Sequence, residues 1–103
     1  MYDIAIIGGG PAGLAAGLYG ARGGMDTVLL ENMLVGGQIT KTTQVDNYPG
    51  FPDGIDGFAI GTNMQKQAER FGLEIKRTGV DSVELEGEIK RLHCGRGVIE
   101  AKA

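Results

Sequence analysis

The chain has 103 residues, of which 42% are apolar and 22% charged, and this composition is typical of one globular domain. A net charge of −3 leaves no basic face for nucleic acid, and one cysteine cannot form an internal disulfide. The apolar runs are far shorter than the roughly 20 residues of a membrane helix. Because Met1-Tyr2-Asp3 does not resemble a signal peptide, we expect a cytoplasmic protein that binds neither nucleic acid nor membrane.

The chain begins with a short apolar strand that runs into a glycine-rich turn. Residues 2–7 are almost continuously apolar, as in a buried parallel strand, and Gly8-Gly9-Gly10-Pro11-Ala12-Gly13 follows directly. The first and third glycines let the backbone approach a pyrophosphate, while the last lets the next helix press against the strand. That helix points its free N–H groups at the phosphates. The sequence therefore predicts a dinucleotide-binding turn formed by Gly8, Gly10, Pro11, Ala12 and Gly13.

A helix and a second strand follow this turn. Pro11 suits a first helical turn, and the helix is predicted to run to about Arg22. Glycines recur every three or four residues along one side of it, which indicates close approach to the sheet; the alternative is a weak helix that ends near Gly20. A buried strand over residues 27–30 completes a right-handed βαβ unit and ends at Glu31. Glu31 is the expected ribose ligand, and the alternative is a solvated carboxylate at the strand end.

The next segment, residues 32–56, shows neither helical nor strand periodicity and holds the remaining prolines. A loop of this length in a compact domain usually has a function when it is ordered. Asp56 can cap a helix from Gly57 to Phe71. The inner side of this helix is predicted to carry Phe58, Met64, Ala68 and Phe71, with Gly72 closing the helix.

The remaining residues read as strands. Residues 73–76 alternate apolar and polar and should form a third parallel strand. Segments near 80–85, 89–94 and 98–101, separated by Glu86-Gly87-Glu88 and Gly95-Arg96-Gly97, predict a three-stranded antiparallel meander. Neighbouring strand residues point to opposite faces, so we interpret His93 and Cys94 as structural or surface residues rather than as a base and a nucleophile.

Two loop segments carry a resemblance to a known family. They are Gly36-Gly37-Gln38 and Val45-Asp46-Asn47-Tyr48-Pro49-Gly50-Phe51. With the glycine turn, in this order and at this spacing, they resemble the start of the low-molecular-weight thioredoxin reductases, FAD-dependent enzymes that use NADPH. The resemblance covers essentially the whole chain. It implies an α/β fold: a partial Rossmann-like FAD-binding domain with three parallel strands in the order 3-2-1, two helices and the antiparallel meander.

The resemblance also implies which residues meet FAD. The turn from Gly8 to Gly13 would wrap the pyrophosphate, and Glu31 with Asn32 would meet the adenosine ribose. Val80 would offer backbone contacts near the adenine. No catalytic residue and no metal ligand is expected within the chain.

A further set of residues would approach the isoalloxazine ring. Two adjacent glycines let the chain pass close to a flat ring, and amide side chains can donate and accept hydrogen bonds along its edge. For the two amides the alternative is turn chemistry alone, since Asn-x-Pro-Gly forms a good turn by itself. This set consists of Gly36, Gly37, Gln38 and Asn47.

The family's Cys-x-x-Cys pair, its NADPH-binding motif and the C-terminal segment that completes its FAD site are not found in this sequence. We therefore expect residues 1–103 to be the N-terminal part of an FAD-binding domain. The larger enzyme would be a homodimer in which NADPH reduces FAD and FAD reduces a disulfide that is exchanged with thioredoxin.

Several alternatives stay open. The larger protein could instead be a ferredoxin/flavodoxin-NADP reductase or the flavoprotein of a peroxide-reducing system. If the chain is complete, a non-catalytic FAD-binding module is favoured. With the strand order 3-2-1, residues 4–7 leave an apolar sheet edge open, so the isolated chain is expected to be marginally stable or self-associating.

Overall fold

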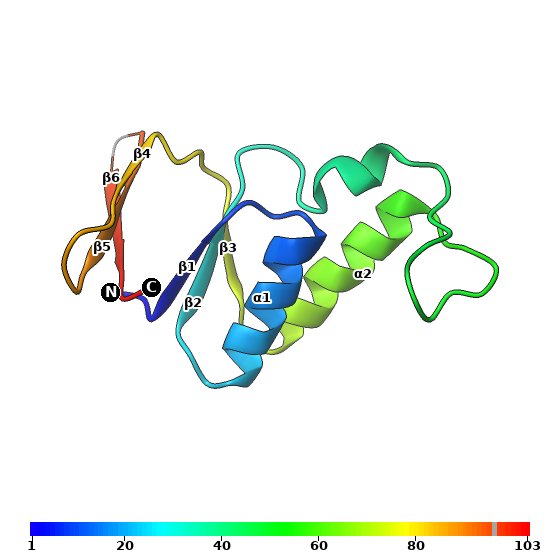
Figure 1. Cartoon of the computed structure of the whole chain (residues 1–103), viewed down its shortest axis with the longest axis horizontal. Helices are drawn as coiled ribbons and strands as arrows, with labels where there is room; N and C mark the ends of the chain where they lie inside the picture. The colour runs from blue at the N-terminus through cyan, green and yellow to red at the C-terminus, as the bar shows by residue number, and fades with distance from the viewer. Residues whose placement is uncertain (96) are drawn as a thin grey trace.

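The computed structural model describes residues 1–95 and 97–103, which form three layers (Figure 1). The middle layer is a parallel sheet of β1 (Ile4–Ile7), β2 (Thr27–Leu30) and β3 (Glu74–Lys76), in the order β1-β2-β3. The antiparallel sheet has the order β4-β5-β6 and consists of β4 (Ser82–Glu84), β5 (Lys90–Cys94) and β6 (Gly97–Ala101). The predicted α/β fold, strand order and meander are confirmed; Arg96, in the second predicted turn of the meander, lies outside the described residues.

Strand β2 is the centre of the fold because both of its faces are covered. All four of its residues are buried, with exposures between 0% and 2%. Leu29 packs against Leu14 and Ala68 of the helix layer, whereas Val28 and Leu30 pack against residues of the antiparallel sheet. A strand buried on both faces needs a continuous apolar run, and this explains why the alternating pattern of an exposed sheet is missing here.

Helix α1 (Pro11–Arg22) lies unusually close to the sheet. A Cβ added at Gly17 would lie 2.6 Å from Leu73 Cδ2, and one added at Gly20 would lie 2.8 Å from Thr27 Oγ1. The glycines thus face the sheet, as their spacing predicts. The helix continues to Arg22, so the alternative of an early end near Gly20 is wrong.

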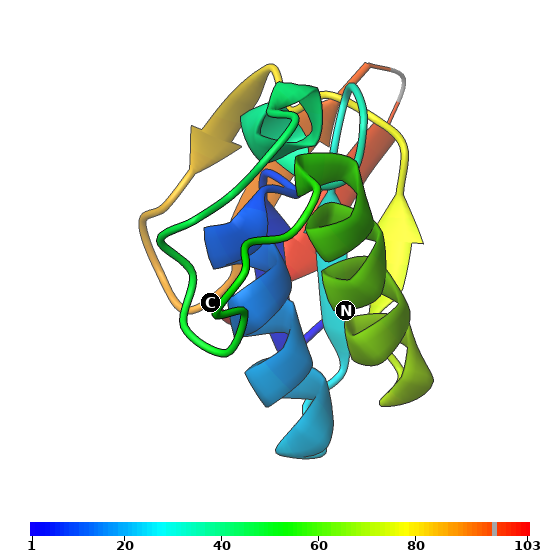
Figure 2. The same ribbon diagram turned by 90° about the vertical axis from the view of Figure 1, so that its right-hand side faces the viewer.

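Helix α2 (Gly57–Arg70) lies beside α1 over the same face of the sheet (Figure 2). Its predicted start at Gly57 is confirmed, and it ends at Arg70, one residue before the predicted Phe71, which is the C-cap. The Asp56 carboxylate accepts a hydrogen bond of 2.9 Å from the Ala59 N–H, and the Gly72 N–H donates to the Glu69 carbonyl at 3.0 Å. Gly72 has a φ of +105°, a conformation that favours glycine.

The inner face of α2 differs in part from the expectation. Ala68 is buried and Met64 packs against the core as predicted, but Phe58 is 54% and Phe71 is 38% exposed. A close backbone contact sets this face, because a Cβ added at Gly61 would lie 3.2 Å from the Gly36 Cα. The buried residues of α2 are therefore Gly57, Gly61 and Ala68, together with Ile60. Phe71 instead stacks with two guanidinium groups, those of Arg22 and Arg70, at 5.4 and 4.6 Å from its ring centroid.

The long segment between β2 and α2 is more ordered than its sequence indicates. It contains a 3-10 helix, η1 (Gly37–Lys41), which the sequence did not predict. An antiparallel bridge between Val45 and Ile55 closes the rest of the segment into a loop that projects from the end of the molecule opposite the antiparallel sheet (Figure 1).

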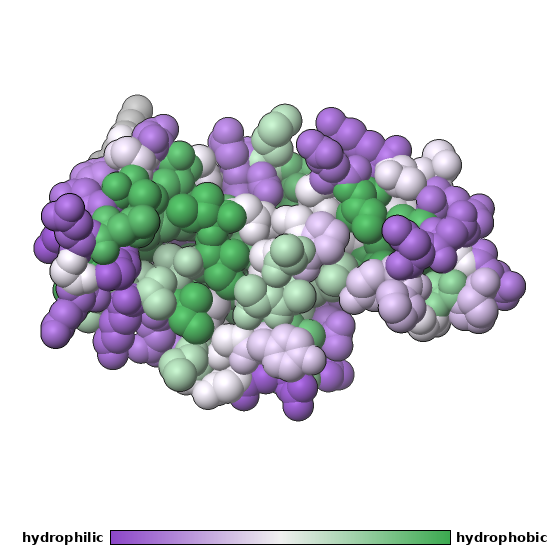
Figure 3. Space-filling model, viewed as in Figure 1, coloured by the Kyte–Doolittle hydropathy of each residue, from purple (hydrophilic) through white to green (hydrophobic). Residues whose placement is uncertain are grey.

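The free edge of β1 is partly covered, so the expected fully open edge is wrong. The Tyr2 N–H donates to the Glu100 carbonyl at 3.0 Å, and the Ala5 N–H donates to the Ala103 carbonyl at 2.9 Å. Ile7, at the other end of β1, remains 58% exposed. Figure 3 shows apolar residues gathered on the side formed by β1 and the antiparallel sheet. Self-association of the isolated chain stays a prediction.

Candidate cofactor-binding site

The glycine turn joins the carboxyl end of β1 to α1 through contacts that leave no room for side chains. Gly8 has a φ of +105°, and its N–H donates to the Leu30 carbonyl at 2.8 Å. A Cβ added at Gly13 would lie 1.9 Å from the Gly8 carbonyl oxygen. The first turn of α1 therefore rests directly on the backbone of the glycine turn, at the carboxyl edge of the parallel sheet where ligands of α/β folds bind.

Gly10 faces open space. It is the N-cap of α1, with a φ of −76°, and no atom lies within 4 Å of the position that a Cβ would take. Pro11 occupies the first helical position, and the Leu14 N–H donates to the Gly10 carbonyl at 2.9 Å. The N–H groups of Ala12 and Gly13 have no hydrogen-bond partner among the described residues. Two donors at the positive end of a helix thus point toward an accessible space, as an anion site requires.

The Glu31 carboxylate is held against the same turn. One oxygen accepts from the Gly9 N–H at 2.9 Å, and the other accepts from the Met33 N–H at 2.8 Å. These hydrogen bonds, the one from Met33 first, lower the pKa of Glu31 below its usual value. The carboxylate therefore stays ionised beside the turn, and this specific placement does not fit the alternative of a merely solvated strand end.

Asn32 and Val80 lie near each other at the carboxyl ends of β2 and β3. The Asn32 Cγ is 3.2 Å from the position of a Cβ added at Gly79, the residue before Val80. Val80 is half-buried and packs against the cluster of apolar residues between the two sheets. The residues predicted for the adenosine half are thus brought together with Glu31.

The second pair of glycines lies directly on the first turn. The Gly36 N–H donates to the Gly9 carbonyl at 2.7 Å, and a Cβ added at Gly37 would lie 2.9 Å from the Gly10 Cα. Both Gly36 (φ +110°) and Gly37 (φ +70°) have left-handed backbone conformations. Gln38 is exposed and lines an open pocket of about 290 Å³ together with Glu31, Met33, Leu34, Gly37, Thr40 and Lys41, called here the η1 pocket.

Asn47 is not brought to this site. It lies in the projecting loop beyond the Val45–Ile55 bridge, where the surrounding hollow is lined only by residues 46–52. Sequence reasoning also missed Gly9, which binds both Glu31 and Gly36 through its backbone. The position of Gly9 between Gly8 and Gly10 could have indicated its role. However, its contacts are made by the backbone, and a sequence pattern reveals such contacts poorly.

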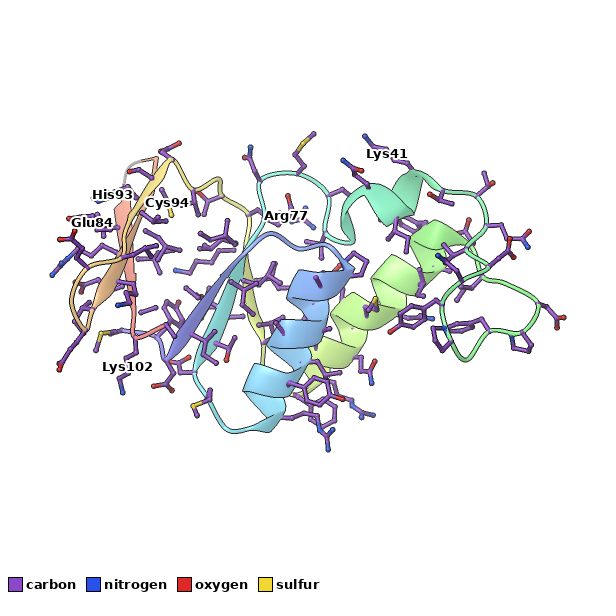
Figure 4. The ribbon with its side chains drawn as sticks, viewed as in Figure 1. Lys41, Arg77, Glu84, His93, Cys94 and Lys102 are labelled. Carbon is purple, nitrogen blue, oxygen red and sulfur yellow. The ribbon has the colours of Figure 1, made fainter. Side chains whose placement is uncertain are left out.

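His93 and Cys94 face opposite sides of β5, as expected (Figure 4). The His93 Nε2 lies 2.7 Å from a carboxylate oxygen of Glu84, on the exposed face of the sheet. Cys94 is buried in the core, and burial raises the pKa of its thiol. The two side chains cannot form a base and nucleophile pair in this arrangement.

Residues 1–95 and 97–103 contain neither a membrane-spanning helix nor a cluster of metal ligands. No helix there is both long enough and apolar enough to cross a membrane. No group of three or more His, Cys, Asp or Glu side chains is arranged to hold a metal ion.

Comparisons with known proteins agree with this geometry. The family model of pyridine nucleotide-disulphide oxidoreductases matches residues 2–101. Thioredoxin reductases of Peptoclostridium litorale and Mycolicibacterium smegmatis are 50% and 40% identical over 103 residues, which is 100% of this chain and 33% of each relative. The chain therefore spans about a third of the length of these relatives.

Solved structures give the same result. Lactococcus lactis thioredoxin reductase in its FR conformation matches with a TM-score of 0.95 and 36% identity, over 100% of this chain and 34% of that one. A ferredoxin-flavin thioredoxin reductase of Clostridium acetobutylicum matches with a TM-score of 0.88 and 29% identity, over 99% of this chain and 35% of that one. By sequence and by fold, the chain belongs to the pyridine nucleotide-disulphide oxidoreductase family, as a segment that resembles the first third of a thioredoxin reductase.

Proposed function

We propose that residues 1–103 form the N-terminal part of the FAD-binding domain of a thioredoxin-reductase-like flavoenzyme. One observation carries the proposal: the turn, the strand-end carboxylate and the second glycine pair converge on Gly9, which binds both Glu31 and Gly36 through its backbone. A glycine-rich turn without a binding function would not need hydrogen bonds to both an ionised carboxylate and a second glycine loop.

The residues at the site fit a dinucleotide. The open space at Gly10 and the free N–H groups of Ala12 and Gly13 suit the pyrophosphate, which gains from the helix dipole as well. Each Glu31 oxygen has a second lone pair and can still accept a hydrogen bond from a ribose hydroxyl. The segment that contains Val80 lies beside Asn32, where the adenine would follow from the ribose.

The remaining assignments concern the flavin ring. In the proposal, Gly36 and Gly37 let the chain pass close to the isoalloxazine, and Gln38 meets its edge. Asn47 would reach the ring only if the projecting loop closes toward the η1 pocket, so its assignment has the least geometric support of the set.

FAD, when bound, would accept a hydride from NADPH and pass electrons to a disulfide that is exchanged with thioredoxin. The residues of this chain would bind and orient the cofactor. Because Cys94 is the single cysteine of the sequence, the redox-active cysteine pair would come from residues outside 1–103. The proposed enzyme would be a cytoplasmic homodimer. A second candidate, in which ferredoxin supplies the electrons, is favoured by the similarity to the ferredoxin-flavin enzyme.

FAD binding by the chain tests the proposal directly. We expect bound flavin to co-elute with the protein on gel filtration and to show altered fluorescence. Gly10→Ala should abolish binding while leaving the fold intact, because the new methyl group meets no neighbour within 4 Å but fills the space for the pyrophosphate. Gly97→Ala is the matched control, since its Cβ also meets nothing and lies in β6. Equal flavin binding by the wild-type protein and Gly10→Ala would contradict the proposal.

A further inference from the structure

An apolar groove lies on the face formed by α1, α2 and the projecting loop, which Figure 2 turns toward the viewer. The groove, called here the helix groove, has a volume of about 270 Å³. Its lining includes Leu18 and Tyr19 of α1, Tyr48 and Phe51 of the projecting loop, and Ile60 and Met64 of α2. None of the lining residues is charged, although 22% of the residues of the chain are. Depletion of charge together with Tyr, Phe and Met is typical of the core of a protein interface.

The aromatic side chains at the helix groove are incompletely buried by the chain itself. Tyr19 is 70% exposed and Tyr48 is 42% exposed. The ring of Tyr48 pairs with that of Phe51, with 6.2 Å between their centroids. Large aromatic side chains gain much from burial by a partner, and Tyr is enriched among the residues that contribute most to binding. The helix groove therefore has the features of a docking surface.

The two ends of the helix groove carry opposite charges. At the loop end, Asp46 and Asp53 are exposed, and residues 45–55 contain no Lys or Arg. The other end, where both helices finish, carries three basic residues, Arg22, Lys66 and Arg70. The single carboxylate of these helix ends, Glu69, leaves a net positive charge there. Among the residues that the structure describes, none of these charged side chains forms an ion pair, so all are available to a partner.

This arrangement of charge is complementary to itself. The C-terminal ends of α1 and α2 are adjacent, because the Arg22 guanidinium lies 5.4 Å from the centroid of the Phe71 ring, and the loop lies toward the opposite end of the helices (Figure 2). A two-fold axis through the helix groove would set the acidic loop of one copy against the basic helix ends of the other, and the same contact would occur twice.

We propose that the helix groove binds a second copy of this chain about such a two-fold axis, with Tyr19 and Tyr48 buried between the copies. The inference deepens the proposed function by assigning the face where the two copies of the homodimer meet. It rests on the proposed function for the expectation of two copies.

The first test measures the oligomeric state by sedimentation equilibrium, without FAD, at micromolar protein concentrations. We expect the wild-type chain to dimerise and Tyr19→Glu to raise the dissociation constant of the dimer about thirtyfold or more, as for a central interface aromatic. Leu85→Glu is the matched control, because Leu85 is 63% exposed on the antiparallel sheet and does not line the helix groove. It should dimerise like the wild type. Both variants should keep the wild-type circular dichroism spectrum, since both side chains are exposed in a single copy.

The second test reverses one charge at each end of the helix groove. Asp53 and Lys66 are chosen because both are exposed, whereas Arg22 and Arg70 stack on the Phe71 ring. Asp53→Lys and Lys66→Glu should each weaken the dimer about fivefold or more at low salt, because the axis repeats every contact twice. An equal mixture of the two variants should form a heterodimer with nearly the wild-type affinity, since both contacts then join opposite charges again.

Three outcomes would overturn the inference. A monomeric wild-type chain would mean that the helix groove takes a different occupant. Dimerisation that survives Tyr19→Glu but is lost in Leu85→Glu would place the contact on the antiparallel sheet. A mixture of Asp53→Lys and Lys66→Glu that associates no better than either variant alone would exclude the two-fold arrangement. A chain that binds FAD as a monomer leaves the proposed function standing, whereas a dimer in which Gly10→Ala binds flavin like the wild type leaves only the interface.

Discussion

Gly13→Ala tests whether the glycine turn depends on direct contact between helix and turn. The added Cβ would lie 1.9 Å from the Gly8 carbonyl oxygen and 3.4 Å from Ile6 Cγ2, whereas real Cβ atoms essentially never approach within 3.0 Å. A backbone carbonyl cannot rotate aside as a flexible side chain can, so the first turn of α1 must move away from β1. Overpacking of this kind costs about 1–3 kcal/mol. The better helix propensity of alanine recovers at most about 1 kcal/mol.

We therefore expect a net loss of roughly 1–2 kcal/mol in the free energy of unfolding. For a domain of this size, each kcal/mol corresponds to about 4–8 °C in Tm, which circular dichroism resolves easily. Gly10→Ala and Gly97→Ala should unfold like the wild type, because neither new methyl group meets a neighbour within 4 Å. If Gly13→Ala has the wild-type Tm and the wild-type free energy of unfolding in urea, the contact between Gly13 and Gly8 is not as tight as described. That result would refute the reasoning.

Three other predictions concern single side chains. Asp56→Ala removes the hydrogen bond to the Ala59 N–H at the start of α2 and should cost about 0.5–2 kcal/mol in urea unfolding; no change would show that the cap contributes nothing. Because backbone hydrogen bonds lower the folded-state pKa of Glu31, its contribution to stability is present above the ordinary carboxyl pKa and is lost as pH falls through the lower folded value. The stability of Glu31→Gln should therefore vary less with acid pH than that of the wild type, and identical curves would contradict this. Cys94 should react with a thiol reagent much more slowly in the folded than in the urea-unfolded chain, because it is buried and its pKa is raised; equal rates would rule out that burial.

Features that depend on neighbouring residues could be predicted from the sequence. The continuous apolar run at 27–30 identified β2, since a parallel strand covered on both faces has no polar side. Pro11 and Asp56 marked the starts of the two helices, and Gly72 marked the end of α2. The contact between the glycine turn and Glu31 could also be predicted from their spacing in the sequence. The two lie at the ends of β1 and β2, which are adjacent strands of one βαβ unit.

Features set by distant backbone contacts could not be predicted in this way. The face that α2 turns inward is fixed where Gly61 meets Gly36, and this contact left Phe58 exposed against the helical pattern. The 3-10 helix η1 depends on the left-handed conformations of Gly36 and Gly37, which a glycine permits but does not require. The position of Asn47 depends on the bridge that closes its loop, for which the sequence gives no periodic signal.

The pairing of residues 100–103 with the start of β1 has a consequence for the order of folding. The βαβ unit and the meander are each built from contacts between residues close in sequence, and such units form quickly. The hydrogen bond between Tyr2 and Glu100, by contrast, closes residues 2–100 into one long loop, which carries an entropic cost. During synthesis on the ribosome, β1 can therefore pair with its outer neighbour only after residues 100–103 have left the exit tunnel.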